Sequence, residues 1–253
     1  MRKTVVVAEN FYEDPDTIRR YARSLDYYYP YQPEASIRSG ELRPTWMTSR
    51  FRPARDCPFK CSFEILQALE AMTGEDIDMG HWSLGFPTNR EGKANVTYRD
   101  GPHSCLWNCS FHVKLNTSQA LGEGVHNHVT DAWNSVGPHG WAGLIYLEPD
   151  APLDGGLKLW KNLNPRRQLD WMTPKENWEL IDDLGNVYNR LLLVRGNIPH
   201  SGAAGWGENV GDGRLFQTFF FKVRSPRLHT AINASAIKRA DRVHLSDEHS
   251  SPC

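Results

Sequence analysis

Three histidines and one aspartate lie within one short segment, "VHNHVTDAWNSVGPH", which runs from Val125 to His139. His126 and His128 are separated by one residue, and side chains two positions apart on a strand point to the same side. Neutral imidazole is a good ligand for iron, zinc and copper. The spacing therefore indicates that His126 and His128 can face one cavity and hold a metal ion.

A further histidine and an arginine lie at the ends of two later apolar runs. "NRLLLVRGNIPHSG" closes an expected strand at His200, and "GDGRLFQTFFF" opens another at Arg214. Two ligands near one strand edge and a third from a distant strand form the order of a non-haem iron site of the facial type. An arginine deeper in such a site would bind a carboxylate through its two-pronged guanidinium group. The order of residues therefore predicts an iron site with a carboxylate pocket.

The elements that must position these residues are mostly short β-rich runs. From residue 78 onward the chain reads "DMGHWSLGF", "ANVTYRD", "CLWNCSFHVKLN", "GWAGLIYLEP", "GGLKLWK", "NRLLLVRGNIPH" and "RLFQTFFFKV", separated by Gly, Pro, Asn and Asp. Many short strands with turn residues between them predict a barrel or a double-sheet jelly roll.

The N-terminal part of the chain has a different pattern. "TVVVAENF" predicts a strand, and "DPDTIRRYARSL" and "SFEILQALEAMTG" predict helices, with Asp14 as an N-cap and Gly74 as a stop. We expect a mainly β protein with N-terminal helices, in one domain over residues 1–253. Its expected parts are a helical N-terminal layer over about 1–75, a jelly-roll core over about 76–224 and a polar C-terminal extension over 225–253.

Bulk composition excludes several kinds of partner. The 253 residues carry 29 basic and 30 acidic side chains, a net charge of -1, which favours neither nucleic acid nor an acidic membrane surface. No apolar stretch approaches the roughly 20 residues that cross a bilayer, and the apolar run near the start is too short for a signal peptide. We therefore expect a soluble, cytoplasmic protein.

Four of the five cysteines form two C-x3-C pairs, Cys57 with Cys61 and Cys105 with Cys109. Two such pairs could hold a structural zinc ion. Reduced, partly buried thiols are the simpler interpretation in a cytoplasmic protein.

Several of these motifs resemble a known family. "GWAGLIYLEPDAPLDGGLKLWKN", "NRLLLVRGNIPHSG" and "GDGRLFQTFFF" resemble the iron(II)- and 2-oxoglutarate-dependent oxygenases, in the prolyl-hydroxylase-like branch. "VVVAENFYEDPDTIRRYA" resembles the leader of bacterial and phage relatives, so the resemblance covers about residues 4–224. It implies a double-stranded β-helix (jelly-roll) core with iron(II) at one open end and 2-oxoglutarate as cosubstrate.

The resemblance also implies a role for individual residues. His126 matches the proximal histidine, His200 the distal histidine, and Arg214 the partner of the 2-oxoglutarate C5 carboxylate. Tyr146 and Gln217 stand where side chains line the cosubstrate pocket of the family.

The chain departs from the family at the third iron ligand. The family pattern is His-x-Asp, and here the third position is His128. His128 could replace the carboxylate, or Asp131 could reach the metal from a longer loop. Alternatively neither binds, which would leave a vacancy for a halide, as in the related halogenases. The sequence leaves these three arrangements open.

The implied reaction is oxidation, most simply hydroxylation, of a small molecule or peptide by molecular oxygen. The alternatives are a related halogenase, a three-histidine dioxygenase or cupin-like protein that uses no 2-oxoglutarate, and a jelly-roll module without catalysis. Trp206 and His139 are candidate walls of the substrate pocket, and the polar loops 88–104 and 162–178 are candidate lids. No feature identifies the substrate.

Overall fold

Two antiparallel β-sheets form the centre of the chain. The computed structural model describes residues 3–29, 34–41, 45–49, 59, 62–83, 107–118, 124–129, 135–166 and 172–226. The larger sheet has seven strands in the order β1-β9-β6-β11-β5-β3-β2, the smaller has three in the order β10-β7-β8, and β12 pairs with β4. The strands are β1 (Val5–Ala8), β2 (Tyr27–Tyr28), β3 (Met47–Ser49), β4 (Glu75–Ile77), β5 (Phe111–Lys114), β6 (Trp141–Tyr146), β7 (Leu157–Asn162), β8 (Trp178–Leu184), β9 (Leu191–Arg195), β10 (His200–Gly202), β11 (Arg214–Phe221) and β12 (Val223–Pro226).

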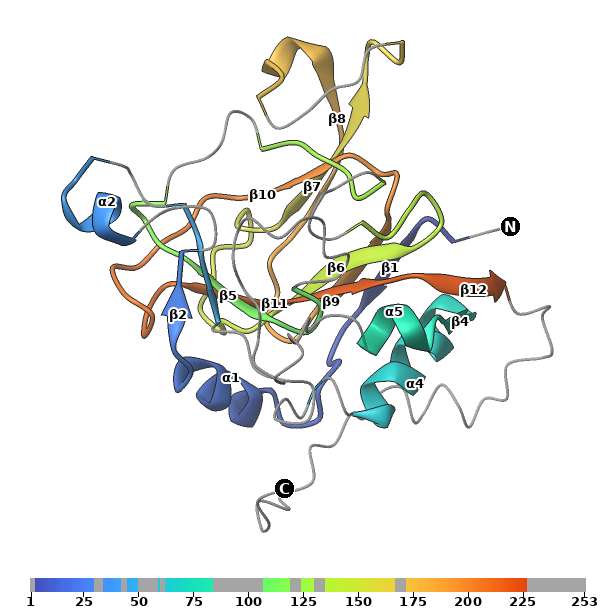
Figure 1. Cartoon of the computed structure of the whole chain (residues 1–253), viewed down its shortest axis with the longest axis horizontal. Coiled ribbons are helices and arrows are strands. Elements are labelled where there is room, and N and C mark those ends of the chain that lie inside the picture. Colours follow the sequence, from blue (N-terminus) through green and yellow to red (C-terminus); the bar gives the residue numbers. More distant parts are fainter. Residues whose placement is uncertain are drawn as a thin grey trace, which may run out of the picture.

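Helices cover one face of the larger sheet, and the smaller sheet covers the other (Figure 1). The helices are α1 (Pro15–Arg23), α2 (Glu34–Arg38), α4 (Phe63–Thr73) and α5 (Met79–Ser83), with a 3-10 turn at Lys175–Asn177. Ile18 of α1 and Leu69 of α4 pack into one buried cluster with Leu193 and Phe219 of the sheet. Among the described residues, no helix combines the length and the apolar character that a membrane crossing requires.

The interior between the two sheets is a second apolar layer. Leu144 and Leu192 of the larger sheet pack there against Leu157 and Leu159 of β7. Strand alternation divides β11 between the two layers. Leu215, Phe219 and Phe221 belong to the cluster under the helices, whereas Phe216 packs in the layer between the sheets.

Both predicted N-terminal helices are confirmed. The carboxylate of Asp14 accepts a hydrogen bond from the Thr17 amide at the start of α1. Ser62 caps α4 in the same way, and the helix stops at Gly74, whose φ of 73° lies in the left-handed region that glycine adopts without strain.

Two parts of the sequence reading differ from the structure. Residues 79–83, predicted as part of a β run, form α5, because Asp78 accepts hydrogen bonds from the amides of His81 and Trp82 and starts a helical turn. The expected helical layer also contains β1, β2 and β3, three strands of the larger sheet, since their backbone groups pair with strands from later in the chain.

Candidate metal centre and carboxylate pocket

His126 and His200 are joined directly through their backbones. The two residues form an isolated antiparallel bridge, in which each amide donates to the other's carbonyl, at 3.0 and 2.8 Å. His200 is the first residue of β10, which pairs with β7 in the smaller sheet. The bridge therefore places both imidazoles at one edge of this sheet, with ring centroids 4.6 Å apart.

His128 is held from two sides. Its amide donates to the Gly196 carbonyl at 2.7 Å, and its own carbonyl accepts from Val136 at 2.9 Å and Gly137 at 3.2 Å. Gly196 has to be glycine, because a Cβ there would lie 2.2 Å from the Gly137 carbonyl oxygen. His128 is buried, and its ring packs edge-on against Phe220.

The three histidines together form a candidate metal centre. One ligand atom from each of His126, His128 and His200 lies within 4.8 Å of the others. The Nδ1 atoms of His126 and His200 lie 2.9 and 2.8 Å from the carbonyl oxygens of Gly124 and Ile198. A carbonyl oxygen only accepts, so each Nδ1 carries the proton and each Nε2 keeps the lone pair that a metal needs.

Arg214 is a buried cation beside this centre. Its Nε donates to the Gly155 carbonyl at 3.1 Å, and its terminal nitrogens reach the carbonyls of Gly156 and Ala203 at 3.5 Å. Its side chain also faces Gly202, where a Cβ would lie 3.5 Å from Nη1. Within the part of the chain that the structure describes, no carboxylate pairs with Arg214, although the residue is only 1% exposed.

Aromatic rings surround the Arg214 guanidinium. Its Cζ lies 5.0 Å from the ring of Phe216 and 5.9 Å from the rings of Tyr146 and Trp206. Gly155 makes room for Trp206, because a Cβ there would lie 2.8 Å from the indole. These rings exclude water from the cation and leave carbonyl groups as its polar neighbours.

The Tyr146 hydroxyl is a second unsatisfied group in this pocket. It is buried, and no described residue makes a well-formed hydrogen bond to it. Burial raises the pKa of Tyr146 to about 12, and the nearby Arg214 guanidinium opposes that rise only in part. A neutral hydroxyl and a guanidinium, both without an anionic partner, suit a carboxylate ligand.

Lys114 lies directly opposite Arg214 in the pairing of β5 with β11. Its ammonium donates to the Ala203 carbonyl at 2.8 Å, the same oxygen that Arg214 reaches. Burial, and then the charge of Arg214, lower the pKa of Lys114 to about 8. The pocket thus contains two cationic side chains.

The position of Gln217 corrects the expectation that it lines this pocket. Its side chain accepts a hydrogen bond from the Tyr12 hydroxyl at 2.5 Å and donates to the Cys109 carbonyl at 3.3 Å. Gln217 stands an odd number of residues from Arg214 on β11, so the two side chains leave opposite faces of the strand.

The other candidate residues lie apart from the histidine cluster. His139 is exposed in the turn before β6, and its carbonyl accepts a hydrogen bond from Arg195 at 2.5 Å. Trp206 is half-buried beside Arg214, on the carboxylate side of the site. Asp131, the alternative third ligand, lies outside the described residues, as do loop 88–104 and residues 167–171 of the other candidate lid.

The proposed cysteine pairs stay predictions. Cys57, Cys61 and Cys105 lie outside the described residues, whereas Cys109 is buried with a free thiol.

A buried ion pair supports the histidine end of the site. Arg195 and Glu75 are both almost fully buried and lie 2.7 Å apart, and Glu75 also accepts a hydrogen bond from the Trp141 indole. The Arg195 guanidinium stacks on that indole, with its Cζ 3.9 Å from the ring centroid. Because Arg195 precedes Gly196, this pair fixes the carbonyl that holds the His128 amide.

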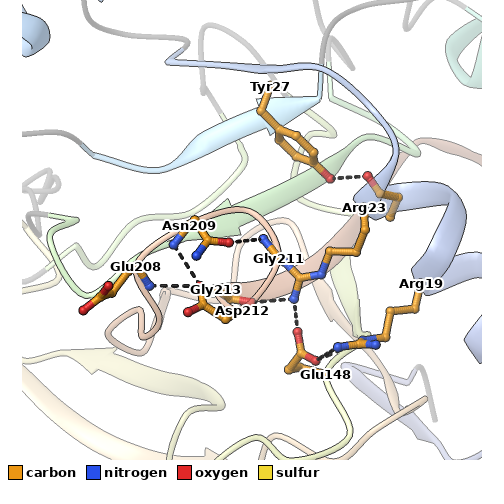
Figure 2. Close-up of polar contacts among 10 residues, drawn as sticks. Arg19, Arg23, Tyr27, Glu148, Glu208, Asn209, Gly211, Asp212 and Gly213 are labelled. Atoms are coloured by element: carbon orange, nitrogen blue, oxygen red, sulfur yellow. Dashed lines mark hydrogen bonds and ion pairs between the residues drawn. The ribbon is translucent and has the colours of Figure 1, made fainter.

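A second ion cluster supports the arginine end (Figure 2). Glu148, after β6, binds Arg19 and Arg23 of α1, and Arg23 also donates to the Gly213 carbonyl at 2.8 Å. Gly213 is the residue before Arg214. The cluster therefore ties α1 to the start of β11.

The turn that leads into Arg214 is ordered by its own side chains, as Figure 2 also shows. The Asp212 carboxylate accepts from the amides of Glu208 and Asn209 at 3.0 and 2.8 Å, and these bonds lower the pKa of Asp212. The Asn209 side chain accepts from the Gly211 amide at 2.7 Å.

Sequence reasoning missed Lys114, Glu148 and the Glu75–Arg195 pair. Lys114 ends the run "FHVK", and an ionisable residue at the end of an apolar strand was the available signal. Glu148 and Glu75 gave no signal, because their partners come from distant parts of the chain.

Comparisons with known proteins give low similarities. No protein-family model and no curated protein sequence matches the chain. The non-haem α-ketoglutarate-dependent epimerase SnoN from nogalamycin biosynthesis is similar at a TM-score of 0.43 and 8% identity, over 90% of this chain and 83% of its own. A prolyl-4-hydroxylase from Pseudomonas putida is similar at a TM-score of 0.37 and 13% identity, over 88% of this chain and 94% of its own. Both are enzymes of the class that the sequence motifs resemble, but values this low assign no function, which has to come from the side chains of the site.

Proposed function

We propose that the protein is a non-haem iron(II)- and 2-oxoglutarate-dependent oxygenase with a double-stranded β-helix core. Iron(II) would be held by His126, His128 and His200, and the distal carboxylate of 2-oxoglutarate by Arg214 and Tyr146. The bound metal and cosubstrate would supply oxygen activation and the oxidation of a small molecule or peptide, with hydroxylation as the simplest outcome.

The observation that carries this proposal is the placement of Arg214 relative to His200. The guanidinium faces Gly202, two residues after His200 on β10. At a rise of about 3.3 Å per residue, these two backbone positions lie roughly 7 Å apart. A short dicarboxylate could therefore reach the histidine cluster with one end while its other carboxylate neutralises Arg214.

The protein's own groups would position the cosubstrate and exclude water. The carbonyls of Gly155 and Gly156 orient the guanidinium, and Phe216 and Trp206 shield it, so a carboxylate in this pocket meets a charge of low hydration. The carbonyls of Gly124 and Ile198 hold the imidazole tautomers. Such orientation of ligand groups is the protein's main share in cofactor chemistry.

His128 is the third ligand in this proposal. It lies in the same cluster as His126 and His200, and its backbone is fixed by Gly196, Val136 and Gly137. Three neutral imidazoles would leave the charge of the metal uncompensated by the protein, in contrast to a set that contains a carboxylate. Asp131 remains the competing ligand.

Anaerobic titration with iron(II) and then 2-oxoglutarate tests the assignment. Wild-type protein should bind one iron(II) and develop the weak visible charge-transfer band of the chelated cosubstrate. His128→Ala should lose iron, whereas Asp131→Ala and the exposed control His139→Ala should keep both iron and band. Iron loss in Asp131→Ala alone would exchange the two residues. Bound iron without a band in the wild type would contradict the use of 2-oxoglutarate and favour a three-histidine dioxygenase.

A further inference from the structure

The two cationic side chains of the pocket have an unusual environment. Lys114 and Arg214 face each other across β5 and β11, and both donate to the Ala203 carbonyl. Among the described residues, neither forms an ion pair with a carboxylate. Two neighbouring charges removed from water, with carbonyl oxygens as their acceptors, are costly unless an anion joins them.

The chain that covers Lys114 leaves little room for a protein anion there. The loop after β10 packs tightly on the end of β5, since a Cβ at Gly205 would lie 2.3 Å from the Leu115 carbonyl oxygen. The carboxylates of this loop, Glu208 and Asp212, are exposed, and Asp212 is used by backbone amides. An anion that pairs with Lys114 would therefore come from solution.

We propose that Lys114 is a second cationic group of the carboxylate pocket, which binds the distal carboxylate of the cosubstrate together with Arg214. This inference rests on the proposed function and deepens it. Arg214 supplies a fixed, permanent charge. Lys114 supplies a charge that depends on pH, and with it the affinity for the dicarboxylate becomes dependent on pH.

The titratable groups around Lys114 define the pH window. Arg214 faces it from β11, Tyr146 lies beyond Arg214 on β6, and His112 precedes it on the same face of β5. The pKa of Tyr146 is about 12 and that of His112 about 3, and Arg214 keeps its proton throughout. Between pH 7 and 9.5, Lys114, whose pKa burial lowers to about 8, is therefore the pocket group that changes charge.

Binding of an anion should raise the pKa of Lys114, so protons are taken up on binding above pH 8. The dissociation constant of the dicarboxylate should be constant from pH 7 to 8. Above pH 8 it should rise by up to about tenfold per pH unit, because an increasing share of the free protein must first be protonated.

The test is calorimetric titration of the chelator-treated, full-length protein with succinate, from pH 7 to 9.5. Pyruvate, which lacks the distal carboxylate, serves as the ligand control. Lys114→Met should bind succinate about tenfold more weakly at pH 7 and show no pH dependence. Lys114→Arg should match the wild type at pH 7 and keep its affinity to pH 9.5. The matched control is Lys161→Met, an exposed lysine of β7 that pairs with Glu179.

Two results would overturn the inference, and they differ in what they say of the function. If Lys114→Met binds succinate like the wild type at every pH, Lys114 takes no part in the pocket, and the oxygenase proposal stands. If the wild type binds neither succinate nor, with Mn(II) at the histidines, 2-oxoglutarate, both proposals fail. The flat profile expected for Lys114→Arg keeps the test valid should Lys114→Met fold poorly.

Discussion

His126 and His200 exchange both of their backbone hydrogen bonds, at 3.0 and 2.8 Å, although they are far apart in the sequence. The bridge fixes the spacing of the two imidazoles independently of their side-chain contacts. A metal centre built on it forms only when β10 has paired and the segment at His126 has joined it, so metal binding and folding are coupled.

The first prediction follows from this coupling. Zinc(II), which imidazole binds well, should stabilise the wild-type protein because it binds the folded chain. At about one hundred times its dissociation constant, the free energy of unfolding should rise by about 2.7 kcal/mol. His200→Ala should show no rise, and the exposed control His139→Ala should show the full rise. Thermal unfolding with and without zinc measures both, and equal stabilisation of all three proteins would exclude this centre.

Much of the candidate site could be predicted from local sequence features. His126, His128, His200 and Arg214 lie at strand ends marked by Gly, Pro or Asn, and strand alternation alone places two of the histidines together. The same alternation, counted from Arg214, would have placed Gln217 on the opposite face. That error came from carrying a role over from a resemblance without checking the face of the strand.

The rest of the site depends on long-range pairing. Lys114 enters the pocket because β5 lies beside β11, and Glu75 meets Arg195 because α4 and β4 pack beside the end of β9. The order of strands in a sheet is set by tertiary packing, and periodicity along a single sequence does not contain it.

The second prediction concerns the buried pair of Glu75 and Arg195. Glu75→Gln removes the only charge paired with Arg195 among the described residues, while it keeps the shape of the side chain. An uncompensated buried charge should lower the free energy of unfolding by about 3 to 5 kcal/mol. Glu179→Gln, which breaks the exposed pair with Lys161, should cost at most about 1 kcal/mol. Urea denaturation gives both values, and equal effects would show that the buried pair contributes no more than a surface pair.

The third prediction concerns the cluster around Glu148. Glu148→Gln should leave the mostly buried Arg23 without its carboxylate and destabilise the protein by about 2 to 3 kcal/mol. Because Arg23 also holds the Gly213 carbonyl, the change should weaken succinate binding at Arg214 without altering zinc affinity at the histidines. The control is Glu9→Gln, which removes an exposed partner of Arg190. A variant that loses stability but keeps the succinate affinity of the wild type would limit the cluster to a structural role.

The fourth prediction concerns His112, which lies buried on the interior face of β5. Its Nε2 lies 2.9 Å from the Thr218 hydroxyl, which itself donates to the Trp107 carbonyl, so Nε2 must carry a proton and donate to Thr218. Its Nδ1 then accepts from the Thr48 hydroxyl at 3.0 Å. The ring is thus satisfied in its neutral form, and burial lowers the pKa of His112 to about 3.

The sign of the pH effect follows from the depressed pKa. Between pH 6.5 and 3 the unfolded chain binds a proton at His112 that the folded chain does not, so stability falls as the pH falls. The loss approaches about 1.4 kcal/mol per pH unit, which amounts to about 2 kcal/mol between pH 7 and pH 5. His112→Gln, whose amide can donate to Thr218 and accept from Thr48, should lack this contribution. Carboxylates and the other histidines titrate alike in both proteins, so the difference between their urea stabilities at the two pH values isolates His112. Parallel losses in wild type and variant would mean that His112 takes up its proton equally well in the folded state.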